Sequence, residues 1–139
     1  MPMVSVRRAP SYDDRLMDET VAAHFEALGV EKDLSPEMRV LLKPNLLAGR
    51  APALAVTTHP GLLGAVARWL RARGIRDIVL ADSPGGVYTA AALRKVYAAC
   101  GLNVLSPLVT LNEDVSSGER GGFTLIRPVL EADYIINCA

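Results

Sequence analysis

The sequence predicts an α/β fold in which a mostly parallel sheet is layered with helices. Two short apolar runs, Val40–Leu42 and Ile78–Ala81, have the continuous hydrophobic pattern of strands that are covered on both faces. A helical stretch separates them, and strands that alternate with helices are joined by right-handed crossovers into a parallel sheet. Polar clusters follow both runs, at the sheet edge where open α/β proteins place their sites.

The N-terminal region is expected to contribute a short strand and a helix. Val4–Arg8 alternates apolar and polar residues, which is typical of a strand. Ser11 or Asp13 can cap the helix that follows, because apolar residues recur at helical spacing over Leu16–Leu28. Gly29 supplies the stop for this helix.

A loop and a second helix are predicted between the two apolar runs. Leu46–Val56 contains two prolines and no clear periodicity, so we expect a loop that crosses the carboxyl edge of the sheet. Thr57 or Thr58 can cap the next helix, and Pro60 fits its first turn because the missing N–H would be unpaired there. Gly74 ends this helix.

After the second apolar run, Ser83-Pro84-Gly85-Gly86 is expected to turn the chain into a third helix. This helix is predicted over Thr89–Ala99, with Gly101 closing it.

The C-terminal part is predicted to be mainly extended. Asn103–Ser106 and Leu108–Leu111 look extended, Ser116–Gly122 is expected to be a turn or exposed loop, and Phe123–Arg127 a strand that completes an antiparallel hairpin. Ala132–Ala139 has the pattern of a buried strand. We therefore expect one α/β domain over residues 1–139, and a fragment of a longer parent, because an α/β unit normally adds a covering helix after such a strand.

Composition restricts the classes of function. The 139 residues suit one domain, and with 15 basic and 15 acidic side chains the net charge is zero, so we expect no nucleic-acid or membrane partner. Arg68, Arg71, Arg73 and Arg76 are better explained as a solvated helix face than as a phosphate-binding patch. The chain shows no signal core and no apolar stretch of about 20 residues, so a soluble cytoplasmic protein is expected.

Cys100 and Cys138 are the only cysteines, and their wide separation matches no zinc or iron–sulfur motif. Both lie in apolar surroundings, which favours reduced, buried thiols. We therefore expect no metal site and no cofactor in this chain itself.

Lys43 and Asn45 follow the first apolar run and form the first candidate binding pair. An ammonium and an amide at the end of a strand can hold a carboxylate or phosphate. The alternative is that Lys43 extends to solvent while Asn45 bonds the backbone of its own loop.

Thr57, Thr58 and His59 stand at a predicted helix start, where free N–H groups and the helix dipole favour an anion. The threonines are explained equally well by ordinary capping. His59 could donate to an anion or act as an acid or base. His24, by contrast, falls on the apolar stripe of the first helix and is expected to be a hydrogen-bonded core histidine.

Asp82, Ser83, Gly85 and Gly86 form the third cluster, in which the glycines would let a ligand approach the backbone. Asp82 could bind a metal, orient His59 or cap the next helix. The glycines match neither a dinucleotide fingerprint nor a phosphate loop, and nothing marks Ser83 as an activated nucleophile. Asn137 could present its amide at the same edge, so the candidate ligand-binding set has no assigned catalytic residue.

Four segments in this order, VLLKPNLL, VTTHPGLLGAVARWLRARG, IVLADSPGG and ADYIIN, resemble the domain of unknown function family DUF362. The resemblance runs from about Val4 to Ala139, and Lys-Pro-Asn is among the recognisable marks of the family. It implies a bacterial or archaeal α/β domain associated with redox or iron–sulfur proteins. Longer members continue into a lysine and histidine motif, and many carry ferredoxin-type cysteine clusters, so an iron–sulfur cluster is expected only in a longer parent.

The leading hypothesis is a domain that binds a small anionic or phosphorylated ligand at the carboxyl edge of its strands, within a redox or metal-dependent parent. The alternative is a structural module whose last strand pairs with a second copy, giving a homodimer, or with the missing C-terminal region. A third interpretation makes the segment a scaffold for an electron-transfer domain.

Overall fold

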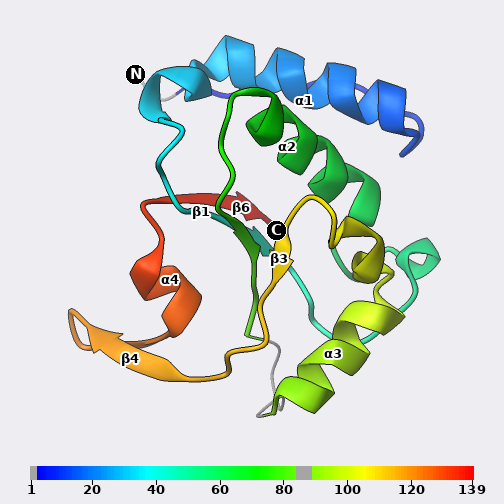
Figure 1. The fold of residues 1–139 in the computed structure, drawn as a ribbon. Coiled ribbons are helices and arrows are strands. Elements are labelled where there is room, and N and C mark those ends of the chain that lie inside the picture. Colours follow the sequence, from blue (N-terminus) through cyan, green and yellow to red (C-terminus); the bar gives the residue numbers. More distant parts are fainter. Residues whose placement is uncertain (1–2, 84–88) are drawn as a thin grey trace.

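A computed structural model describes residues 3–83 and 89–139 of the chain. Its centre is a parallel sheet in the strand order β3-β2-β1-β6 (Figure 1). The strands are β1 (Val40–Pro44), β2 (Ile78–Leu80), β3 (Thr110–Leu111) and β6 (Tyr134–Cys138). A separate antiparallel hairpin joins β4 (Ser117–Arg120) to β5 (Phe123–Ile126). The predicted α/β class, with a mostly parallel sheet and a hairpin near the C-terminal end, is confirmed.

Helices cover both faces of the sheet. In the described part of the chain the α-helices are α1 (Asp14–Leu28), α2 (Pro60–Ala72), α3 (Ala90–Ala99) and α4 (Arg127–Glu131). Short 3₁₀ turns occur at Val30–Asp33, Pro52–Leu54 and Leu102–Leu105. Figure 1 shows α1 and α2 together on one side of the sheet and α4 on the other. Within residues 3–83 and 89–139, none of the helices combines the length and apolar character that crossing a bilayer requires.

The apolar runs are buried because each strand contributes to two cores. Val40 and Leu42 of β1 pack with α1, α2 and α3 in the larger core. Leu41, between them, points to the opposite face and packs with Val79 and with Val129 of α4. Alternate residues of a strand face opposite sides of the sheet, so a run that is apolar throughout is required here.

The boundaries of α1 follow the predicted caps, and α3 begins close to the predicted residue. Asp13 precedes α1 and its Oδ1 accepts a hydrogen bond from the Leu16 N–H at 2.9 Å. A hydrogen bond from the Ser11 hydroxyl also holds the pKa of the Asp13 carboxyl below its ordinary value. Gly29 follows α1 in the left-handed conformation at φ 69°, where glycine is favoured. Thr89 caps α3 through the Ala92 N–H.

Two predicted extended segments have other conformations. Val4–Arg8 forms no strand; it lies beside α1, where the Ser5 Oγ is 2.8 Å from the His24 Nδ1. An alternating pattern alone does not make a strand when no neighbouring strand is available to pair with it. His24 is thus hydrogen-bonded as expected, but half-buried rather than in the core. Asn103–Ser106 falls largely in the 3₁₀ turn after α3.

The C-terminal segment also differs in two details. Ser116–Gly122 was expected to be a turn or loop, but most of it is β4, and the turn is confined to Gly121 and Gly122, which have positive φ. The last strand was expected to be buried, but β6 lies at the edge of the sheet and alternates in burial, with Ile135 44% exposed.

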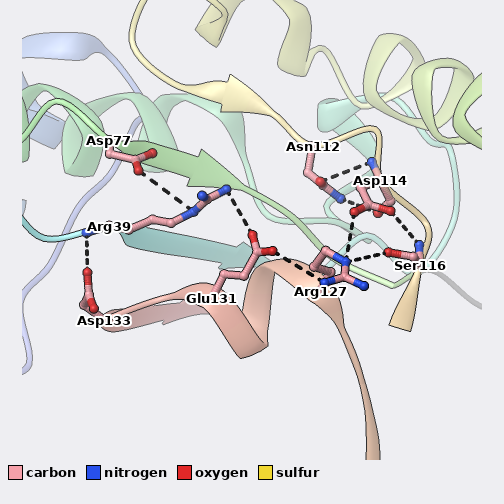
Figure 2. A network of polar contacts seen from close by, with 8 residues as sticks. All are labelled: Arg39, Asp77, Asn112, Asp114, Ser116, Arg127, Glu131 and Asp133. Atoms are coloured by element: carbon pink, nitrogen blue, oxygen red, sulfur yellow. Dashed lines mark hydrogen bonds and ion pairs between the residues drawn. The ribbon is translucent and has the colours of Figure 1, made fainter. Parts of the chain in front are cut away.

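A polar network ties α4 and the last strand to the amino end of the sheet (Figure 2). The Arg39 N–H donates to the Asp133 Oδ2 at 2.8 Å, and its guanidinium lies 3.5 Å from the Glu131 carboxylate. Glu131 in turn pairs with Arg127, which reaches Asp114 beyond β3. The network therefore joins the start of β1 to α4 and to the segment that follows β3.

Candidate functional site

A cavity of about 250 Å³ opens at the carboxyl end of the sheet, between the ends of β1 and β6 and the start of α2. It brings together four of the predicted site residues, Asn45, Thr57, Thr58 and His59. We call it the edge pocket; its other lining residues are Tyr12, Ala55, Val56, Leu62, Cys138 and Ala139.

Thr58 is hydrogen-bonded to the ends of two strands beside the edge pocket. Its Oγ1 accepts a hydrogen bond from the Asn45 N–H at 2.8 Å and donates one to the Cys138 carbonyl at 2.6 Å. The Thr58 N–H also donates to the Asn45 carbonyl at 3.1 Å. Thr58 therefore links the end of β1 to the end of β6, and it does not cap α2.

His59 is the residue that caps α2. Its Nδ1 accepts a hydrogen bond from the Gly61 N–H at 3.1 Å, and its carbonyl accepts from the Leu62 N–H. In the neutral ring an accepting Nδ1 requires the proton on Nε2, so the free nitrogen of His59 is a donor. The N–H groups of Gly61 and Leu62 are thus used within the helix start.

Thr57 has a role different from that of its neighbour. Its Oγ1 is shielded from solvent and has no hydrogen-bond partner within the described part of the chain. A buried hydroxyl that lacks a partner costs about 1–3 kcal/mol, and most buried polar atoms therefore have one. Thr57 lines the edge pocket, so a small movement of its side chain would expose this hydroxyl to a ligand there.

Lys43 and Asp82 form an ion pair beside the pocket rather than within its lining. The Lys43 Nζ lies 3.1 Å from the Asp82 Oδ1 and also donates to the Pro44 carbonyl at 3.2 Å. Asp82 accepts the Leu46 N–H on its other oxygen at 2.8 Å. Asp82 therefore anchors the loop after β1, and Thr89, not Asp82, caps α3. The hydrogen bond that orients the His59 ring comes from the Gly61 N–H rather than from Asp82.

The remaining candidates are spread along the edge. Asn137 pairs in register with Lys43 on the neighbouring strand, and its side chain is exposed. Ser83 is also exposed. Gly85 and Gly86 lie outside the described residues. Among residues 3–83 and 89–139, no group of three or more His, Cys, Asp or Glu side chains is arranged to hold a metal ion.

Sequence reasoning missed two contributors to the pocket. Cys138 is one of its lining residues, and burial raises the pKa of the Cys138 thiol to about 11, so the sulfur is protonated at neutral pH. Tyr12 stacks on the His59 ring with centroids 3.8 Å apart and planes at 16°. No local pattern in the sequence connects Tyr12 with a helix start almost fifty residues away.

The chain is similar in sequence to a known protein. The sequence is 35% identical over 82 residues to a thylakoid-associated protein of Synechocystis sp., a match that covers 58% of the chain and 25% of that protein. The chain thus spans about a quarter of the length of this relative. No solved structure matches the chain.

A family model described as domain of unknown function (DUF362) matches residues 40–139. The match begins at the first strand of the sheet, later than the resemblance expected from about Val4, so α1 and the segment before it lie outside it. It includes the ends of β1 and β6 and the start of α2, which surround the edge pocket. Since the match extends over well more than half of its length, the chain belongs to the DUF362 family.

Proposed function

We propose that the edge pocket binds a small anionic ligand, either a carboxylate or a phosphate. The observation that carries the proposal is Thr57, a residue of the pocket lining whose shielded hydroxyl has no partner among the described residues. The His59 Nε2–H and the Asn45 amide are two further donors of that lining. No Asp or Glu side chain is found among the described residues that line the pocket, so the side chains of its wall do not repel an anion.

The volume of the edge pocket narrows the class of ligand. At about 250 Å³ it lies below the ~300–1,000 Å³ typical of sites for drug-sized ligands. Inorganic phosphate, a phosphate ester group or a short carboxylic acid fits this volume better than a whole dinucleotide. Lys43 lies near the same edge, but its charge is offset by Asp82, so neutral donors provide most of the recognition.

For the intact protein, we propose a role beside redox or iron–sulfur chemistry in a bacterial or archaeal cytoplasm. The family resemblance supports this placement, and the chain's coverage of only a quarter of its relative leaves room for further segments. A cluster would then be held by cysteines outside this chain. Absorption spectra and iron analysis of the full-length parent test the idea, and a parent free of iron would contradict it.

The ligand proposal is tested by an amide NMR titration of the chain with inorganic phosphate and with acetate, at ionic strength held constant with chloride. We expect shifts centred on Asn45, Thr57 and His59. His59→Asn keeps an N-cap acceptor but removes the Nε2 donor, and should weaken binding about tenfold or more, as should Thr57→Val. The chain is also titrated with its C-terminus amidated, because Ala139 lines the pocket and its carboxylate competes for the same donors.

The matched control is His24→Asn, which alters the other histidine on α1, outside the edge pocket. This variant should bind phosphate and acetate like the unmodified chain. If neither anion perturbs the pocket in the unmodified and amidated chains, the proposed function is wrong.

We propose self-association through β6 as a second candidate function. β6 is the outer strand of the sheet and pairs with β1 on one side within the described part of the chain. Its five residues include neither proline nor a charged side chain, the features that usually protect an edge strand, and Ile135 is 44% exposed. Such a strand can pair with the same strand of a second copy.

Sedimentation velocity over a range of protein concentrations tests this pairing. We expect a monomer–dimer equilibrium that Ile135→Lys shifts toward the monomer, because a charge at the strand edge opposes pairing. Val104→Lys is a matched control, since Val104 is an exposed valine on the 3₁₀ turn after α3. A chain that stays strictly monomeric at millimolar concentration would exclude the self-association.

A further inference from the structure

We infer that Tyr12 is a positioning residue for the edge pocket, acting through His59. The inference rests on the proposed function, because it assigns to His59 the donor that meets the ligand. Tyr12 lies outside residues 40–139, the part of the chain matched by the family model. A residue from the segment before the family domain therefore takes part in the edge pocket.

Two independent contacts fix the two rotations of the His59 ring. The ring of Tyr12 lies parallel to it at 3.8 Å, which sets the plane of the imidazole. The hydrogen bond from the Gly61 N–H to Nδ1 then selects one of the two orientations within that plane. With both contacts made, the Nε2–H is held in one direction, as a preorganised donor requires.

The backbone of Tyr12 is held closely enough to make this contact persistent. A Cβ added at Gly61 would lie 2.8 Å from the Tyr12 carbonyl oxygen and 3.1 Å from the His59 Nδ1. Only glycine at this position lets the chain before α1 lie directly on the first turn of α2. Asp13, the next residue, caps α1, so Tyr12 is anchored from its C-terminal side as well.

Tyr12 contributes little to the hydrophobic core. Its side chain is 54% exposed, although it is large and aromatic, and it lines the edge pocket. Its removal therefore leaves the main core of the sheet intact. The expected consequence is a loosened His59 ring in a folded protein.

The test compares Tyr12→Leu, which removes the stacked ring, with Tyr12→Phe, which retains it. The first readout needs no ligand: long-range ¹H–¹⁵N NMR spectra report which ring nitrogen of each histidine carries the proton. We expect the unmodified chain and Tyr12→Phe to show His59 protonated on Nε2, and Tyr12→Leu to show a mixture of tautomers. His24 is the internal reference and should not change, because its partner is Ser5.

The second readout is the affinity for inorganic phosphate, which should fall about 3- to 10-fold in Tyr12→Leu and be restored in Tyr12→Phe. Unchanged His59 nitrogen shifts in Tyr12→Leu would overturn the positioning role, whatever the affinity. If the unmodified chain binds neither phosphate nor acetate while its His59 tautomer still depends on Tyr12, the positioning role is supported and the proposed function fails. The two ideas are therefore separable in one set of variants.

Discussion

Replacing Thr58 with valine is expected to lower the free energy of unfolding by about 3 kcal/mol. Valine keeps the shape of threonine but leaves the Asn45 N–H and the Cys138 carbonyl without their partner. Each unsatisfied group costs about 1–3 kcal/mol when shielded from water, and the half-buried position of Thr58 keeps the sum in the middle of the range. Urea denaturation followed by circular dichroism measures the change.

The neighbouring residue provides the matched control. Thr57→Val makes the same chemical change, but the Thr57 hydroxyl has no partner in the described part of the chain. The free energy of unfolding should therefore stay constant or rise by about 1 kcal/mol, while phosphate affinity falls. Thr58→Ser, which retains the hydroxyl, should recover most of the stability. Equal destabilisation by Thr57→Val and Thr58→Val would contradict the two roles assigned here.

The strands and helices that local patterns encode could be predicted from the sequence. β1 and β2 were recognisable because both faces of these strands are covered, which demands apolar residues throughout. The start of α1 was recognisable because Asp13 satisfies the Leu16 N–H only three residues away; Thr89 does the same for α3, although Asp82 was the cap considered there. Such interactions join residues that are close in the sequence, so the local pattern of residues indicates them directly.

Elements that depend on distant partners could not be predicted in the same way. Val4–Arg8 has the alternation of a strand, but no strand edge receives it, and it lies beside α1 instead. β4 has few apolar residues and forms because β5 pairs with it. For such segments the pairing partner decides the conformation, and the local pattern carries little information.

The candidate site shows the same division between local and distant information. Asn45, Thr57, Thr58 and His59 stand at boundaries between elements, and the carboxyl edge of a parallel sheet brings such boundaries together. Their roles could not be predicted, since the bond from Thr58 to Cys138 joins residues 80 positions apart. Capping by His59 was also missed, because threonine is the commoner cap and the histidine ring acts here only through its Nδ1.

Asp82→Ala is expected to lower the free energy of unfolding by about 2 kcal/mol. The substitution leaves the Leu46 N–H without its acceptor at the start of the loop after β1, and Leu46 is itself fully buried. It also leaves the Lys43 ammonium unpaired, but that side chain is 38% exposed and remains hydrated, so the ion pair contributes the smaller share. Urea denaturation checks the value.

Asp82→Asn distinguishes the two contributions, because an amide oxygen can still accept the Leu46 N–H while the charge is lost. We expect Asp82→Asn to lower the free energy of unfolding less than half as much as Asp82→Ala does. A loss equal to that of Asp82→Ala would show that the charge dominates.

The same variants separate the ion pair from the edge pocket, whose lining includes neither Lys43 nor Asp82. If folded Asp82→Asn binds phosphate as the unmodified chain does, recognition depends on the neutral donors around Thr57. If its affinity rises, the Lys43 charge that Asp82 no longer offsets takes part in binding, and Lys43 belongs to the ligand site as the sequence predicted.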